Sequence, residues 1–141
     1  MAYAEKQIVN LNETAITLAS TGVKARWTPG VQGGTIRRWF LQLEQATTTT
    51  AAVVVLKKRP TPGSASGEVV LQSLTLSATE AAGNTVYGND LQATILPGEQ
   101  VIIEVTTAAT AGALTYAGLE FDPDWEVPTN AKASVINRMT P

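Results

Sequence analysis

Apolar side chains along this chain recur mainly at every second residue, in short runs that glycine and proline separate. A two-residue period is typical of β-strands that bury one face. The clearest alternating runs are residues 14–18, 39–43 and 101–105, while residues 53–56 are continuously apolar. The continuous run, followed by Lys57, predicts a central strand that leaves its sheet there. Helical periodicity is nearly absent, although residues 79–92 are compatible with a short helical turn.

Two runs change phase along their length. In residues 68–78 the apolar positions move from odd-numbered to even-numbered residues, and in residues 114–121 they move from even to odd. A one-residue slip turns every following side chain to the other face, so each switch predicts a β-bulge or a strand that passes between sheets. Gly118 suits such a bulge. Together these runs predict an all-β fold: a two-sheet antiparallel β-sandwich, jelly-roll-like.

Glycine, proline and polar residues mark the connections. Residues 60–67 predict a long exposed loop, and residues 96–99 predict a tight turn with proline second and glycine third. The alternation ends after Phe121, and three prolines follow. We therefore expect a sandwich domain over residues 1–124 and an extended C-terminal tail over residues 125–141. The tail carries apolar side chains for docking on a partner or on its own domain, among them Trp125, Val127 and Ile136.

Composition favours a binding protein. The chain has 141 residues, of which 44% are hydrophobic and only 16% charged, against about a quarter charged in ordinary domains. A surface poor in charge can lie against another protein at little desolvation cost. Neither cysteine nor histidine occurs, which removes the thiolate, the commonest general base and the commonest metal ligand. We expect no enzymatic activity, no cofactor, no metal and no small-molecule substrate.

The net charge of −2 gives no global attraction to nucleic acid. No apolar run is long enough for a membrane span, and the N-terminus lacks the pattern of a signal peptide. We therefore expect neither nucleic acid nor a membrane as a partner, and synthesis in the cytoplasm.

Three acidic or aromatic patterns have competing interpretations. Asp90, Asp122 and Asp124 resemble calcium ligands in type, but the loop of an EF-hand is missing and aspartate beside proline is ordinary turn chemistry. Glu104 and Glu120 are conceivable as a glycosidase pair, yet each is better explained as the solvent-facing residue of an alternating strand. Trp39 is in register with the apolar positions of residues 39–43 and is therefore expected in the core. Trp27 and Trp125 lie near prolines, where either a protein or a sugar contact fits.

The basic clusters are the strongest candidates for partner contact. They consist of Arg37, Arg38, Lys57, Lys58 and Arg59. Nucleic acid could use them, but they are short and the net charge is negative. A solvated sheet edge or a salt bridge between subunits is the favoured interpretation. With Trp125, Val127 and Ile136 they complete the predicted partner-binding residues. We also expect contacts from residues 2–8 and from the loop over residues 57–67.

Residues 93–107, ATILPGEQVIIEVTT, lead into Ala111 and Gly112. This stretch, within a cysteine-free sandwich of threonine- and alanine-rich strands, resembles the cement (decoration) proteins of tailed-bacteriophage heads. The resemblance extends over roughly residues 10–121. It implies a jelly roll on the capsid exterior of the virion that bridges neighbouring major capsid subunits, often as a homo-oligomeric dimer or trimer. It supplies no catalytic residues. The alternative function is a carbohydrate- or receptor-binding sandwich module of a phage tail appendage.

Overall fold

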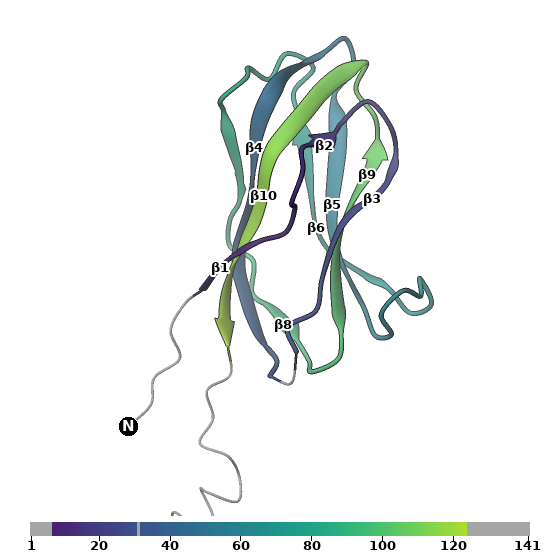
Figure 1. The fold of residues 1–141 in the computed structure, drawn as a ribbon, viewed down its shortest axis with the longest axis vertical. Coiled ribbons are helices and arrows are strands. Elements are labelled where there is room, and N and C mark those ends of the chain that lie inside the picture. The colour runs from purple at the N-terminus through teal and green to yellow at the C-terminus, as the bar shows by residue number, and fades with distance from the viewer. Residues whose placement is uncertain (1–6, 31, 124–141) are drawn as a thin grey trace, which may run out of the picture.

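The computed structural model describes residues 7–30 and 32–123, which form ten β-strands in two sheets that pack face to face (Figure 1). The described residues contain no helix. The strands are β1 (Gln7–Asn10), β2 (Ile16–Thr17), β3 (Gly22–Trp27), β4 (Gly34–Thr48), β5 (Ala52–Arg59), β6 (Val69–Leu76), β7 (Thr85–Gly88), β8 (Ala93–Ile95), β9 (Gln100–Thr107) and β10 (Ala111–Pro123). The predicted antiparallel β-sandwich is confirmed.

The strand order is that of a jelly roll. Sheet A runs β1-β10-β4-β7, with β2 also beside β10 and β8 also beside β4, and sheet B runs β3-β9-β5-β6. If β1 with β2 counts as one interrupted strand, and β7 with β8 as another, each sheet contains four strands. Successive strands then alternate between the sheets, except for β5 and β6, which are neighbours in sheet B, as in a jelly roll. Every pairing is antiparallel.

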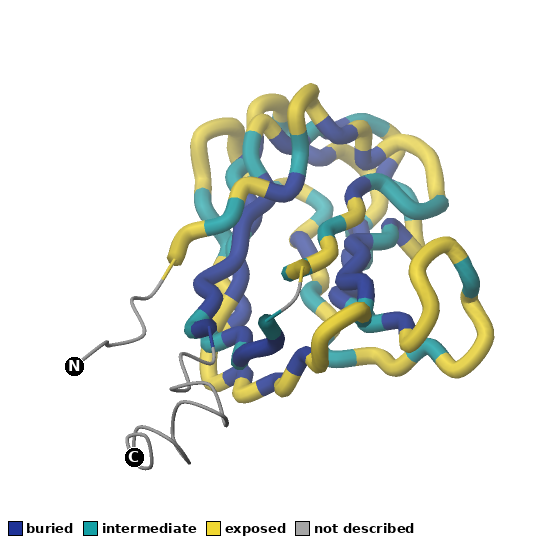
Figure 2. The backbone as a smooth tube through the Cα atoms, turned by 60° about the horizontal axis from the view of Figure 1, so that its bottom comes forward, coloured by how far each residue is buried: buried dark blue, intermediate teal, exposed yellow. Residues whose placement is uncertain are grey.

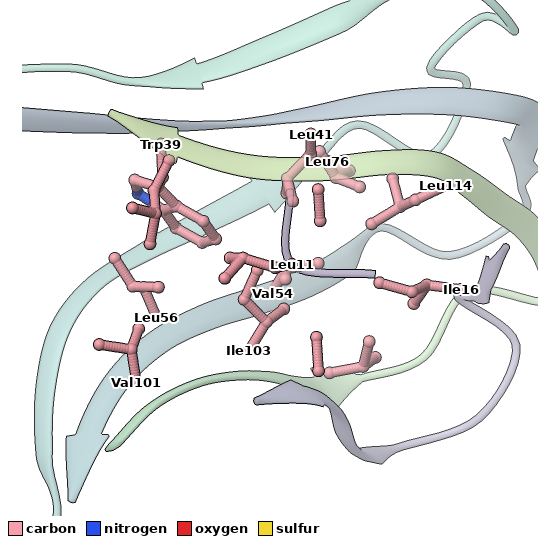
Figure 3. Packing of buried hydrophobic residues seen from close by; sticks show 14 of the residues in the cluster. Leu11, Ile16, Trp39, Leu41, Val54, Leu56, Leu76, Val101, Ile103 and Leu114 are labelled. Carbon is pink, nitrogen blue, oxygen red and sulfur yellow. The ribbon is translucent and has the colours of Figure 1, made fainter. Parts of the chain in front are cut away.

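The core lies between the sheets, as the alternating runs require. Trp39 and Leu41 from β4 meet Val54 and Leu56 from β5, and all four side chains are buried (Figure 3). The indole Nε1–H of Trp39 donates a hydrogen bond of 2.7 Å to Gln72 Oε1, which links sheet A to sheet B. Trp39 is therefore a core residue, as predicted.

Both predicted bulges are present, but one of them lies at a different residue from the one predicted. The register between β5 and β6 shifts at Leu71, which has no partner of its own, within the predicted run of residues 68–78. On β10 the extra residue is Thr115, because Leu114 pairs with Leu43 and Tyr116 with Gln42. The prediction that Gly118 forms the bulge is wrong.

Three further expectations need correction. Residues 79–92 hold turns and β7, not a helical turn, because pairing with β4 decides the conformation of this segment. The run over residues 14–18 reduces to the two-residue β2. Lys57 does not leave the sheet, since β5 continues to Arg59 between two partner strands.

The predicted connections are present. Glu99 N donates to Leu96 O at 3.1 Å, and Gly98 adopts a φ of +86°, as a type II turn requires at its third position. Residues 60–67 form an exposed loop beside sheet B (Figure 2). Strand β10 continues to Pro123, two residues past the predicted end of the alternation.

Candidate functional site

Three aromatic side chains lie together on the outer face of sheet A, the face turned away from the core. They come from three strands: Phe40 from β4, Tyr87 from β7 and Tyr116 from β10. Phe40 is paired with Tyr87 on one side and with Gly118 on the other. Because alternate residues of a strand point to opposite faces, the burial of Trp39 and Leu41 in the core turns Phe40 outward.

The rings are in contact with one another. The centroids of Phe40 and Tyr116 are 5.3 Å apart with the planes tilted by 39°, and those of Phe40 and Tyr87 are 6.0 Å apart with a tilt of 50°. Gly118 makes room for this arrangement. A Cβ atom at Gly118 would lie 2.8 Å from Tyr116 Oη and 2.9 Å from Phe40 Cε2. The glycine is required because the rings cover it, rather than because of a bulge.

Arg38 borders the aromatic rings. Its guanidinium carbon lies 5.4 Å from the centroid of the Tyr87 ring, within the range of a cation–π interaction. Its Nε donates to Glu120 Oε2 at 2.7 Å. Glu120 is only 6% exposed, so the expectation that it faces solvent is wrong. The ion pair fixes the guanidinium beside the rings.

The rings, Arg38 and an edge residue form one exposed surface, which we call the outer aromatic face: Ile8, Arg38, Phe40, Tyr87 and Tyr116. Ile8 of β1 pairs with Glu120 and is 58% exposed, and Tyr87 is 48% exposed. Tyrosine, phenylalanine and arginine are the side chains that interface centres favour. This face can therefore contribute binding free energy through rigid aromatic groups that are already ordered.

Arg37 has a different role from its neighbour. It is the extra residue of a bulge in β4, because Arg38 pairs with Glu120 and Ile36 with Phe121. Its guanidinium donates from Nη2 to Asp122 Oδ2 at 2.9 Å and from Nη1 to Gln92 Oε1 at 3.2 Å. These contacts tie the last strand to β4 and to the segment before β8.

Lys57 and Arg59 lie on sheet B, away from the outer aromatic face. Lys57 Nζ donates to Glu104 and to Glu68 at 2.9 Å each, and Arg59 Nε donates to Glu68 at 3.1 Å. The hydrogen bonds to Glu104 and then Glu68 raise the pKa of Lys57, and those from Lys57 and then Arg59 lower the pKa of Glu68. The network holds the start of β6 against β5, so these side chains serve the fold, and β5 is a central strand rather than a sheet edge.

Lys58 joins the two sheets at one end of the sandwich. Its Nζ donates to the backbone oxygen of Thr94 in β8 at 2.9 Å and lies 3.5 Å from Glu99 Oε1. Glu99 in turn accepts a hydrogen bond from Leu96 N at 2.7 Å, which closes the predicted turn. Lys58 therefore holds the turn in position, and its positive charge is engaged within the fold.

Trp27 is not a free loop residue. It ends β3, and its ring meets Phe121 edge-on, with centroids 4.9 Å apart and planes at 79°. The side chain is partly buried and packs against the core. Trp125, Val127 and Ile136 lie outside the described residues, as does the N-terminal stretch over residues 1–6.

The carboxylates do not form a catalytic pair. Glu104 lies on β9 of sheet B and Glu120 on β10 of sheet A, both on outer faces, so the sandwich separates them. Asp122 is paired with Arg37. Within residues 7–30 and 32–123, no group of acidic residues is arranged to hold a metal ion.

A shallow groove of about 510 Å³ runs between the β1–β2 segment and β3. Its polar lining residues include Asn10, Glu13, Lys24 and Arg26. Asn12 lines the same groove. Its side chain donates to Thr115 O and accepts from Ala117 N, and so holds the β1–β2 segment against β10.

Sequence reasoning did not identify Phe40, Tyr87 and Tyr116 as a site. The signal was partial: Phe40 and Tyr116 each occupy the face opposite to the core positions of their strand. Their contact depends on pairing between strands that are far apart along the chain, which alternation alone does not reveal.

No protein-family model matches the sequence, and no curated protein matches it. One solved structure with a similar chain is that of infectious bursal disease virus, Gx strain. The similarity covers 91% of this chain at 9% sequence identity, with a TM-score of 0.36. This chain spans 33% of the length of that viral chain. The described part of the chain also has no helix long and apolar enough to cross a bilayer.

Proposed function

We propose that this chain is a structural virion protein that binds the outer surface of a phage capsid and cements neighbouring major capsid subunits. The outer aromatic face is the observation that carries the binding role. The phage capsid as partner comes from the resemblance of residues 93–107 to cement proteins.

The contacts of this face suit a permanent protein partner. Arg38 and the three rings hold one another in place, so binding requires little further ordering of side chains. The paired strands β4 and β10 below them are the longest of the fold. A clamp on a pressurised shell needs such a rigid base and no reactive group.

The experiment uses assembled shells and isolated capsid subunits. Genes beside this one for a major capsid protein and a scaffold or protease would identify the shell. The purified chain should sediment with assembled shells and not with isolated subunits, because a cement site forms only between neighbouring subunits. Equal binding to single subunits, or no binding to shells, would contradict the proposal.

The exposed rings also raise a second candidate, a carbohydrate-binding module. A flat sugar platform needs rings whose faces are open and nearly coplanar, whereas the rings here are tilted by 39° and 50°. The tilt favours a protein partner. Glycan binding that is lost in Tyr87→Ala, without any binding to shells, would favour the carbohydrate function instead.

A further inference from the structure

Strand β6 is an unprotected sheet edge. It lies at the end of sheet B, opposite to β3, so its side away from β5 has no strand partner in the described chain. Outside the pairing with β5, no hydrogen bond among the described residues involves the backbone of Val69–Leu76. Unpaired edge amides and carbonyls are a template for another strand.

The other edges of this sandwich are protected. Sheet A ends in short strands of two to four residues, namely β1, β2, β7 and β8. Edge strand β3 carries Lys24 and Arg26, and cationic residues on an edge repel a second copy of the same edge. Strand β6, VVLQSLTL, has eight residues and neither charge nor proline.

The side chains of β6 also expose apolar area. Val69 is 47% exposed and Val70 is 58% exposed, just before the bulge at Leu71. Beyond the bulge, residues 72–76 pair with β5 without interruption and present a straight edge. Exposed valine beside an open edge is typical of a strand that is covered in the assembled protein.

We propose that β6 pairs with β6 of a second copy of this chain, antiparallel about a two-fold axis, so that two copies of sheet B form one continuous sheet. Two-fold pairing places a strand against the same strand of the other copy. Because β6 is uncharged, this pairing brings no like charges together. A β3–β3 pair would oppose Lys24 and Arg26 of one copy to those of the other. Since β6 belongs to sheet B, the outer aromatic faces of both copies stay uncovered.

This inference does not rest on the proposed function, because it concerns the free chain. If the chain does bind a lattice, a dimer with two outer aromatic faces gains affinity through multivalency. Failure to bind shells would leave the self-pairing intact, and a monomer that binds shells would overturn the self-pairing alone.

The test is the mass of the full chain in solution, by light scattering after size exclusion over a range of concentrations. The wild type should be a dimer. The variant Ser73→Lys/Thr75→Lys places charges on exposed β6 positions, and the dissociation constant should rise at least about tenfold from like-charge repulsion. The matched control Thr106→Lys/Thr107→Lys adds the same charge at exposed positions of the central strand β9 and should remain dimeric.

Hydrogen exchange provides a readout that does not depend on how well the variants fold. In the wild type, alternate β6 amides that point away from β5 should exchange slowly at high concentration and rapidly on dilution. A monomeric wild type, a trimer, or a dimer with unprotected β6 amides would each overturn the proposal.

Discussion

Replacing Tyr87 with alanine should weaken partner binding by about 60-fold. The residue is 48% exposed in the free chain, and a tyrosine buries roughly 200 Å² when fully covered. A partner that covers the outer aromatic face therefore removes about 100 Å² of this side chain from water. At about 25 cal/mol per Å² this area is worth about 2.5 kcal/mol, which corresponds to about 60-fold in the dissociation constant.

The assay is equilibrium co-sedimentation of the variant with assembled capsid shells. The matched control is Leu96→Ala, because Leu96 is 55% exposed but lies at the turn before β9, outside the outer aromatic face. The control should bind within about twofold of the wild type. Circular dichroism and thermal unfolding would be used to check that both variants are folded. If Tyr87→Ala binds like the wild type while Leu96→Ala loses affinity, the outer aromatic face is not the binding surface.

Three more predictions concern the packing and stability of the fold. Gly118→Ala should destabilise the fold by about 1 kcal/mol and change the near-ultraviolet circular dichroism, because the new methyl group displaces the ring of Phe40; an unchanged spectrum would contradict the close approach. Gln72→Met should lower the free energy of unfolding, measured by urea titration, by about 1–3 kcal/mol, because the buried indole N–H of Trp39 loses its acceptor. A decrease of less than about 0.5 kcal/mol would show that the hydrogen bond is not needed. The folded-state pKa of Glu68 lies below its usual 4.5. The stability that ionised Glu68 gives to the fold should therefore be complete above pH 4.5 and decline as the pH falls through the folded pKa. Glu68→Gln should flatten this decline in a series of urea titrations at different pH values, and an unchanged dependence of the unfolding free energy on pH would refute the coupling.

Alternation along the chain was sufficient to predict the class of fold. The runs over residues 39–43, 53–56 and 101–105 form long parts of β4, β5 and β9, because strands with one buried face require that pattern. The turn at Gly98 was predicted because few residues other than glycine adopt a positive φ there.

Features that depend on pairing were not predictable from the same pattern. The phase switch in β10 is consistent with an extra residue anywhere between Leu114 and Leu119, and only the register with β4 places it at Thr115. Residues 79–92 contain no strong alternation, and β7 forms because β4 offers it an edge.

The candidate site was predicted only in part. Arg38 was expected to contact a partner, and it borders the outer aromatic face. Lys57 and Arg59 were grouped with it on residue type alone, but they are engaged in ion pairs within the chain on the other sheet. The sequence shows which residues are charged, but it does not show whether an oppositely charged side chain of the same chain already pairs with them.

The orientation of this domain on an assembled particle tests the binding account most directly. A cryo-electron microscopy reconstruction of shells decorated with the purified chain would resolve which sheet faces the lattice. We predict that Phe40, Tyr87 and Tyr116 contact major capsid subunits while the outer face of sheet B points to solvent. A domain bound through sheet B, with the three rings exposed, would contradict the account.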